Sequence, residues 1–380
     1  MKKIFSMAAI ALMGLATFTS CSDDDDNSGG SGREVMITDG VLLINSGNKS
    51  GGIDGSVTNI NPNGWTSEGN VFKTANNRSI GMTANDAITY GSKLYIVVTG
   101  ENTVEVADRN NMKSLKQIST TQLMGEDKGK QPRHVISGNG CVYVSTFDGY
   151  VAVIDTTDYS LKNTYQVGSY PEGMALNGNK LYVCNSDYGM GNASISTIDL
   201  STGGVSEFKS EKLHNCVSIH AEGDALYVLD YGQYDANWNQ LDAGVYKVQN
   251  GEVSKVADAT MMAVSKATGG TKIYTVNAPY SYPAVVPSYQ VFDVNNGTLS
   301  TFITGDDVAS PAAIGVDPVT GYVFIASYTM NPDTGYANYR ENCYVNVYGA
   351  DGKLASRVDG GVGPVAFTFN YSTVKVFDYR

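Results

Sequence analysis

The sequence has few histidines and no closely spaced pair of cysteines. Histidine occurs only three times, at positions 134, 214 and 220, and after Cys21 the cysteines stand alone at positions 141, 184, 216 and 343. Zinc sites need about four ligands, often arranged as Cys-x-x-Cys pairs. We therefore expect no metal site. The sequence alone cannot pair these cysteines in disulfides, and buried free thiols are the simpler expectation.

Positive charge is also scarce. The chain has 26 lysines and arginines against 38 aspartates and glutamates, which gives a net charge of −12 at pH 7. Proteins that bind nucleic acid present a basic surface to the phosphates. The composition therefore argues against nucleic acid as a partner.

Long apolar runs are absent except near the start of the chain, where one extends from Ile4 to Phe18. A transmembrane helix needs about 20 apolar residues, so this run is too short to span a bilayer, and no later run is long enough. Two lysines precede the run and small residues follow it, a pattern typical of a secretory signal peptide. We predict that residues 1–20 are such a leader.

Cys21 directly follows the leader, and four aspartates stand at positions 23–26. The segment Phe18-Thr19-Ser20-Cys21 resembles a bacterial lipobox, in which the cysteine is diacylated and becomes the mature N-terminus. The resemblance implies a lipid anchor at Cys21 and a lipidated acidic linker over residues 21–34. The alternative is an ordinary signal peptide followed by an unrelated cysteine. Taken alone, the acidic tract is a solvated linker.

Glycine-rich turns alternate with short strand patterns through the rest of the chain. A turn followed by a triplet similar to Leu-Tyr-Val recurs about every 47 residues, a period that fits propeller blades of four strands. The triplets lie at 42–44, 94–96, 142–144, 181–183, 226–228, 273–275 and 322–324. We predict an all-β fold, a seven-bladed β-propeller over residues 35–380, with no helix after Cys21.

The two ends of this repeat pattern complement each other. We name the strands of each blade a to d from the inside outward. The first repeat, residues 40–48, begins at strand b, and the last pattern, residues 363–371, is a strand a with no blade after it. The C-terminal strand can therefore pair in the first blade, which closes the ring and removes exposed sheet edges.

The segment at 171–203, PEGMALNGNKLYVCNSDYGMGNASISTIDLSTG, resembles the YVTN-type propeller repeat. With the lipobox and the acidic tract, the chain resembles the BtuG family of propeller lipoproteins from gut bacteria of the Bacteroidetes type. That resemblance implies a lipid-anchored, cell-surface protein of the outer membrane. It also implies that the protein binds cobalamin (vitamin B12) and delivers it to a TonB-dependent transporter. Cobalamin would be a transported ligand, and no cofactor is expected.

The b–c connections are long in most blades, whereas the a–b and c–d turns look short. Long loops on one rim of a rigid scaffold usually carry function. The long b–c connections are residues 45–55, 185–194, 230–244, 277–288 and 327–343. Our candidate ligand-binding residues come from these loops and, for Arg133, from a d–a connection: Tyr188, Tyr231, Tyr234, Asn237, Trp238, Tyr280, Tyr282, Tyr328, Tyr336, Tyr339, Arg340 and Arg133.

Aromatic faces beside amide groups suit a large neutral ligand with both apolar and amide or hydroxyl groups. If the ligand is cobalamin, as the resemblance implies, Arg133 or Arg340 is available to its phosphate. For any single tyrosine, packing between blades is the alternative.

Two other functional classes remain open. A surface module for a glycan or a protein would use the same aromatic loops. A propeller hydrolase or lactonase would need a metal or a histidine–carboxylate pair at the central channel. The histidines are scattered, but carboxylates such as Asp86, Glu172 and Asp230 keep this class open. We expect a binding protein without catalytic residues.

Overall fold

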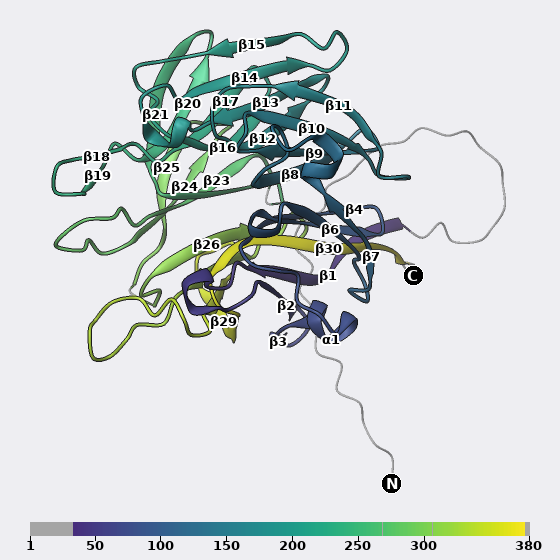
Figure 1. The fold of residues 1–380 in the computed structure, drawn as a ribbon. Coiled ribbons are helices and arrows are strands. Elements are labelled where there is room, and N and C mark those ends of the chain that lie inside the picture. Colours follow the sequence, from purple (N-terminus) through teal and green to yellow (C-terminus); the bar gives the residue numbers. More distant parts are fainter. Residues whose placement is uncertain (1–32, 268, 306, 377–380) are drawn as a thin grey trace, which may run out of the picture.

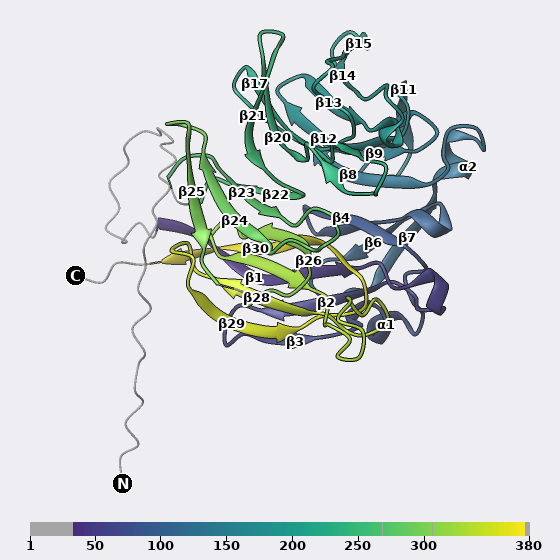
Figure 2. The ribbon, with the colours of Figure 1, turned by 90° about the vertical axis from the view of Figure 1, so that its left-hand side faces the viewer.

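The ring predicted from the repeats is the fold of the protein. The computed structural model describes residues 33–376 except 268 and 306, and they form seven four-stranded antiparallel sheets arranged around a centre (Figures 1 and 2). The prediction of an all-β, seven-bladed propeller is confirmed. The expected leader, Cys21 and the linker up to residue 32 lie outside the described residues.

Each blade contributes one sheet, and its strands follow the order a, b, c, d from the inside outward. Blade 1 consists of β30 (Pro364–Val376), β1 (Arg33–Asn45), β2 (Ser56–Asn61) and β3 (Thr66–Glu68), and blade 2 of β4 (Ala84–Tyr90), β5 (Lys93–Val98), β6 (Thr103–Asp108) and β7 (Ser114–Ser119). Blade 3 consists of β8 (Pro132–Gly138), β9 (Cys141–Thr146), β10 (Tyr150–Asp155) and β11 (Leu161–Gln166), and blade 4 of β12 (Pro171–Asn177), β13 (Lys180–Asn185), β14 (Ser194–Asp199) and β15 (Val205–Phe208). Blade 5 consists of β16 (Cys216–Glu222), β17 (Ala225–Asp230), β20 (Gly244–Gln249) and β21 (Glu252–Asp258). Blade 6 consists of β22 (Met261–Ser265), β23 (Lys272–Asn277), β24 (Ser288–Asp293) and β25 (Thr298–Ile303), and blade 7 of β26 (Pro311–Val316), β27 (Val323–Ser327), β28 (Tyr344–Tyr348) and β29 (Leu354–Asp359).

The hydrophobic core is divided among the junctions between blades. Every pair of neighbouring blades encloses its own apolar cluster, from the blade 1–2 cluster around Leu42 and Leu94 to the blade 7–1 cluster around Leu43 and Phe324. A strand b is therefore covered on both faces, which explains its continuous apolar run. Each large aliphatic or aromatic side chain buried in this way contributes about 1.5–3 kcal/mol.

The C-terminal strand closes the ring as predicted. β30 pairs antiparallel with β1 from Arg33↔Val376 to Asn45↔Pro364, and β1 pairs on its other side with β2. Neighbouring inner strands contact each other from β22 through β26, β30, β4, β8 and β12 to β16. Between blades 5 and 6 the main strand contacts are instead those of β21 with β23 and β24.

The expectation of no helix was wrong in two d–a connections. α1 (Val71–Asn76) buries Phe72 in the blade 1–2 cluster, and α2 (Thr120–Met124) is capped by the Ser119 side chain, which accepts from the backbone of Gln122. Helices of this length are too short to show a 3.6-residue apolar period in the sequence. Single 3-10 turns, η1 (Lys49–Gly51), η2 (Thr99–Glu101) and η3 (Asp187–Gly189), lie in b–c connections. No helix of the described residues is long and apolar enough to cross a membrane.

The two rims of the ring differ as the sequence indicated. The b–c connections of blades 5, 6 and 7 project together at the left of Figure 1, whereas β1 starts and β30 ends on the opposite side. The blade 5 connection is more ordered than a plain loop, because β18 (Gln233–Tyr234) pairs with β19 (Gln240–Leu241) in a small hairpin. We call residues 231–243 the arm, 278–287 the blade 6 loop and 328–343 the blade 7 loop. The face made by all b–c and d–a connections is the long-loop rim.

Candidate functional site: the long-loop rim

Exposed aromatic side chains gather on the long-loop rim. Six of the candidate tyrosines and Trp238 have exposed fractions between 47% and 85%, although large apolar faces are usually buried: Tyr188, Tyr234, Trp238, Tyr280, Tyr282, Tyr336 and Tyr339. They do not form one continuous surface. The structure divides them into three groups on different blades.

The first group lies on the arm and the blade 6 loop. The rings of Tyr234 and Trp238 are 6.4 Å apart between centroids and tilted by 53°. Tyr280 and Tyr282 extend from the adjoining loop, followed by the exposed Val285 and Val286. The pKa of Tyr234 is raised by burial and by Tyr280, so these two side chains are close enough to interact. Asn237, at the tip of the arm, is also exposed.

The second group lies on the blade 7 loop. Tyr328 is half-buried, and burial raises its pKa; its ring meets that of Tyr339 edge to face at a centroid distance of 4.8 Å. The Asn48 side chain donates to the Tyr339 carbonyl across the blade 7–1 junction, at 2.8 Å. Tyr336 at the tip is open to solvent, and so is Arg340. The salt bridges within the described part of the chain do not include Arg340.

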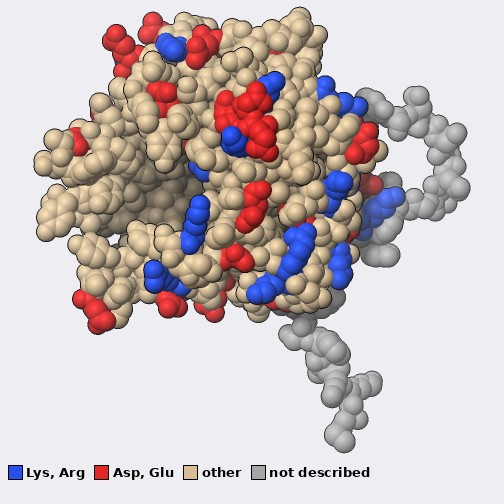
Figure 3. Space-filling model, viewed as in Figure 1, with Lys and Arg blue, Asp and Glu red and all other residues tan. Residues whose placement is uncertain are grey.

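A hollow separates these two groups. Figure 3 shows it at the left of the molecule, between the projecting loops of blades 5 and 6 above and the blade 7 loop below. Its visible walls carry few charged side chains (Figure 3). A concave surface flanked by aromatic residues is the usual form of a small-molecule site.

The third group lies across blades 3 and 4 and includes two residues that the sequence analysis missed. Phe147, Tyr170 and Tyr188 contact one another with centroid distances of 5.3, 5.5 and 6.2 Å. Arg133 lies over the face of Phe147, with Cζ 4.4 Å from the ring centroid. Phe147 escaped notice because it lies in a short b–c connection, and the sequence analysis selected loops by length.

Charged side chains from three inner strands meet at the mouth of the channel. His134 Nδ1 lies 3.1 Å from Asp86 Oδ2, and His134 Nε2 lies 3.3 Å from Glu172 Oε2. Arg133 donates to both oxygens of Glu172, at 2.9 and 3.2 Å, and to Asn85 Oδ1 at 3.0 Å. We call Asp86, Arg133, His134 and Glu172 the channel-mouth cluster.

The ionisation of this cluster follows from its contacts. Burial alone would lower the pKa of His134, but the hydrogen bonds to Asp86 and Glu172 raise it to about 9. Burial opposes ionisation of Glu172, yet His134 and Arg133 hold its pKa below the ordinary value. Burial raises the pKa of Tyr231 to about 12, helped by Glu172 and opposed by Arg133, which places this candidate tyrosine beside the cluster. The cluster therefore holds two cations against two anions.

The sequence analysis treated the histidines as scattered, and the structure brings His134 between two carboxylates. Asp86, His134 and Glu172 are far apart in the chain, but each lies near the start of an inner strand: Asp86 and His134 are the third residues of β4 and β8, and Glu172 is the second residue of β12. The other carboxylate considered, Asp230, is fully buried and accepts from backbone groups of His214, Asn215 and Gly232. Across residues 33–376, leaving aside 268 and 306, no group of three or more histidine, cysteine or acidic residues could hold a metal ion.

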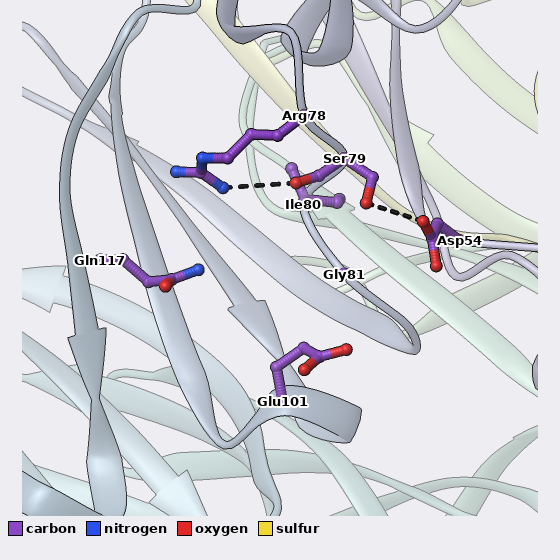
Figure 4. A pocket seen from close by; sticks show the side chains of 7 residues that line it. All are labelled: Asp54, Arg78, Ser79, Ile80, Gly81, Glu101 and Gln117. Carbon is purple, nitrogen blue, oxygen red and sulfur yellow. Dashed lines mark hydrogen bonds between the residues drawn. The ribbon is translucent and has the colours of Figure 1, made fainter.

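A further pocket lies away from the aromatic groups, at the junction of blades 1 and 2. It has a volume of about 400 Å³ and is lined by Asp54, Arg78, Ser79, Ile80, Gly81, Glu101 and Gln117 (Figure 4). Its charged groups are already engaged. Arg78 binds the buried Glu105 at 2.8 Å, Asp54 accepts from Ser79 at 2.7 Å, and Glu101 accepts from the Met82 amide at 3.1 Å. This pocket lacks the aromatic faces found at the hollow.

Comparison with known proteins supports the fold and goes no further. No family model matches the sequence, and no curated protein is similar enough to it to count as a relative. Among solved structures, two described as candidate 6-phosphogluconolactonases, from Bacteroides uniformis and Bacteroides fragilis, are 14% and 13% identical. Both cover 87% of this chain, and this chain covers 100% and 98% of them, with TM-scores of 0.57 and 0.58. The WD40 propeller domain of Doa1 is 11% identical, with a TM-score of 0.54; the match covers 79% of this chain and 91% of that domain.

Proposed function

We propose that this protein is a cell-surface binding module that captures a corrinoid, such as cobalamin, in the hollow of the long-loop rim. The observation that carries the proposal is that exposed tyrosine and tryptophan side chains lie on the loops of blades 5, 6 and 7, the loops that border the hollow. They stand on a rigid ring, so the ligand meets a largely preformed surface.

The chemistry of a corrinoid matches these side chains. A cobalamin has a macrocycle with many methyl groups, several amide arms, a phosphate and an aromatic base. Aromatic faces suit its apolar parts, and amides such as Asn237 suit its arms. Arg133 uses its donors within the channel-mouth cluster, whereas Arg340 beside the hollow is open, which favours Arg340 for the phosphate.

Lipid anchoring and delivery belong to the same proposal. Cys21 would carry the lipid, and it precedes Arg33 by twelve positions, a distance that a chain can stretch to about 40 Å. β1 starts on the side opposite the long-loop rim, so the tether would leave the hollow facing away from the membrane. From this position the protein would deliver its ligand to a TonB-dependent transporter of the outer membrane.

A hydrolytic function is the second candidate, and the channel-mouth cluster is the observation that favours it. A histidine between two carboxylates can act in acid–base catalysis. The arrangement is nevertheless a poor base, because the raised pKa leaves His134 protonated at neutral pH with both ring nitrogens engaged. A module for a glycan remains the third candidate, since sugars also stack on aromatic faces.

Calorimetric titration with cyanocobalamin tests the proposal. The protein lacking residues 1–21 should bind one equivalent with micromolar or tighter affinity. Combined replacement of Tyr234, Trp238 and Tyr336 by alanine should weaken binding at least about 100-fold, since aromatic residues of this kind carry most of an interface's energy. The control is Leu299→Ala, an exposed apolar side chain on β25 away from the rim. Absence of heat, with no cyanocobalamin co-eluting in gel filtration, would overturn the proposal.

A further inference from the structure

The arm and the blade 6 loop are joined by direct hydrogen bonds between two different blades. The Gln240 backbone amide donates to the Tyr280 carbonyl at 2.7 Å, and the Tyr280 backbone amide donates back to the side-chain Oε1 of Gln240 at 3.1 Å. Two residues further on, the Tyr282 amide donates to Asn239 Oδ1 at 3.0 Å. Two side-chain amides and one backbone amide of the arm therefore hold the backbone that carries two exposed tyrosines.

The same two amides are also fixed within the arm. Gln240 Nε2 donates to the Tyr231 carbonyl at 2.8 Å, and Asn239 Nδ2 donates to Asp235 Oδ2 at 2.9 Å. Asp235 in turn accepts from the Asn239 amide, and its carbonyl accepts from the Trp238 amide at 3.0 Å. Each side chain thus bridges the arm that carries Trp238 to the loop that carries Tyr280 and Tyr282.

The aromatic side chains themselves are largely exposed. Asn239 and Gln240 are partly buried, whereas Trp238, Tyr280 and Tyr282 are open to solvent. Among the ring pairs of the described residues, Trp238 meets only Tyr234, and neither Tyr280 nor Tyr282 meets another ring. The bonds also lie over the blade 5–6 junction, where the main strand contacts involve the outer strand β21.

We infer that Asn239 and Gln240 are positioning residues that fuse the arm and the blade 6 loop into one wall of the binding hollow before the ligand arrives. The existence of the wall rests on the hydrogen bonds alone. Its role in ligand binding rests on the proposed function. If the wall is already ordered in the free protein, ligand binding loses no entropy in ordering two loops. Such preorganisation mainly slows dissociation of the ligand.

The wall can be tested without any ligand, because the protein has two tryptophans, Trp65 and Trp238. In a Trp65→Phe background, Trp238 is the sole tryptophan and reports on the arm. Gln240→Ala and Asn239→Ala should lower the fluorescence anisotropy of Trp238 and increase its quenching by acrylamide, with an unchanged melting temperature. The matched control is Gln233→Ala, because Gln233 lies on the same arm and, among the described residues, its side chain bonds only to Asp242 of that arm. Unchanged Trp238 signals in both variants would overturn the inference.

Binding supplies the second readout. Gln240→Ala should weaken the affinity for cyanocobalamin about 10-fold or more through faster dissociation, and Gln233→Ala should not. Asn239 acts through Tyr282, so Asn239→Ala should reduce the affinity for cyanocobalamin much less in a Tyr282→Ala background than in the wild type. Equal losses of affinity in the two backgrounds would contradict a positioning role. If the wild type binds no cyanocobalamin, the proposed ligand is wrong, and the Trp238 signals still decide whether the wall exists.

Discussion

Nε2 of His134 lies 3.3 Å from Oε2 of Glu172, an ion pair that joins the inner strands of blades 3 and 4. Asp86 holds the other ring nitrogen from blade 2. The channel-mouth cluster thus ties three consecutive blades together at the rim that carries the candidate site. Its first consequence is a dependence of stability on pH.

The protein should lose stability between about pH 6.5 and 9 because of His134. Folding raises the pKa of this histidine from 6.5 to about 9, so the protonated form is favoured in the folded state. The stabilisation is complete below pH 6.5 and disappears as the pH rises through 9. Since the side chain is about a quarter exposed, we expect an effect of about 2 kcal/mol.

Denaturant unfolding at pH 6, 7.5 and 9 measures this effect. His134→Asn should reduce the free energy of unfolding at pH 6 and remove most of its decline toward pH 9. The matched control is His214→Asn, which leaves the channel-mouth cluster intact. A parallel decline in wild type and His134→Asn would show that other groups cause the pH dependence.

The same cluster separates binding from hydrolysis. Glu172→Gln leaves Arg133 and His134 without their shared anion, so stability should fall by about 1–3 kcal/mol. Affinity for cyanocobalamin should change less than about threefold, because the hollow is bordered by other residues. Calorimetry measures the cyanocobalamin affinity, and a separate assay measures hydrolysis of a phosphorylated sugar lactone. Lactone hydrolysis by the wild type that Glu172→Gln abolishes would favour the enzyme over the binding module.

The base of the arm depends on a glycine. Gly232 has φ +66°, and a Cβ there would lie 1.9 Å from the Leu241 carbonyl oxygen. Gly232→Ala should therefore displace the arm and weaken ligand binding about 10-fold or more, while the ring remains folded. Gly251→Ala is the matched control, because its φ of +82° is also positive but no other atom of the described residues would lie within 4 Å of the added Cβ. This variant should lose only about 1 kcal/mol of stability and leave binding intact. Equal binding losses in the two variants would contradict this role.

Closure of the ring makes Phe324 a sensitive position. Its side chain is fully buried and meets Trp65, Phe367 and Phe369, which joins blade 7 to the C-terminal strand in blade 1. Phe324→Ala should destabilise the protein by about 3–5 kcal/mol. Leu299→Ala on an outer strand should cost less than about 0.5 kcal/mol. Thermal or denaturant unfolding compares the two, and a small loss at Phe324 would show that this junction contributes little.

The fold was accessible from the sequence because a blade is a local unit. Each strand b reads as one apolar run beside a turn, and the unpaired patterns at 40–48 and 363–371 gave the closure that β1 and β30 confirm. Loop length located the rim for the same local reason. The short helix α1 was missed because Phe72 is buried through contacts that five or six residues of sequence do not reveal.

The grouping of side chains on the rim was not accessible in that way. Asp86, His134 and Glu172 meet only because successive inner strands lie side by side around the channel. The wall around Trp238 depends on backbone groups of Tyr280 and Tyr282 finding amides of another blade. Such contacts depend on the spatial arrangement of blades, and single-sequence patterns carry no record of them.

The crystal structure of the protein with cyanocobalamin tests the central claim most directly. We predict one corrinoid in the hollow between the arm and the blade 7 loop, with Trp238 and Tyr336 within about 4 Å of it and Arg340 near its phosphate. A corrinoid bound at the channel-mouth cluster or in the pocket of Figure 4 would contradict the account, as would crystals grown at saturating ligand in which the hollow holds none.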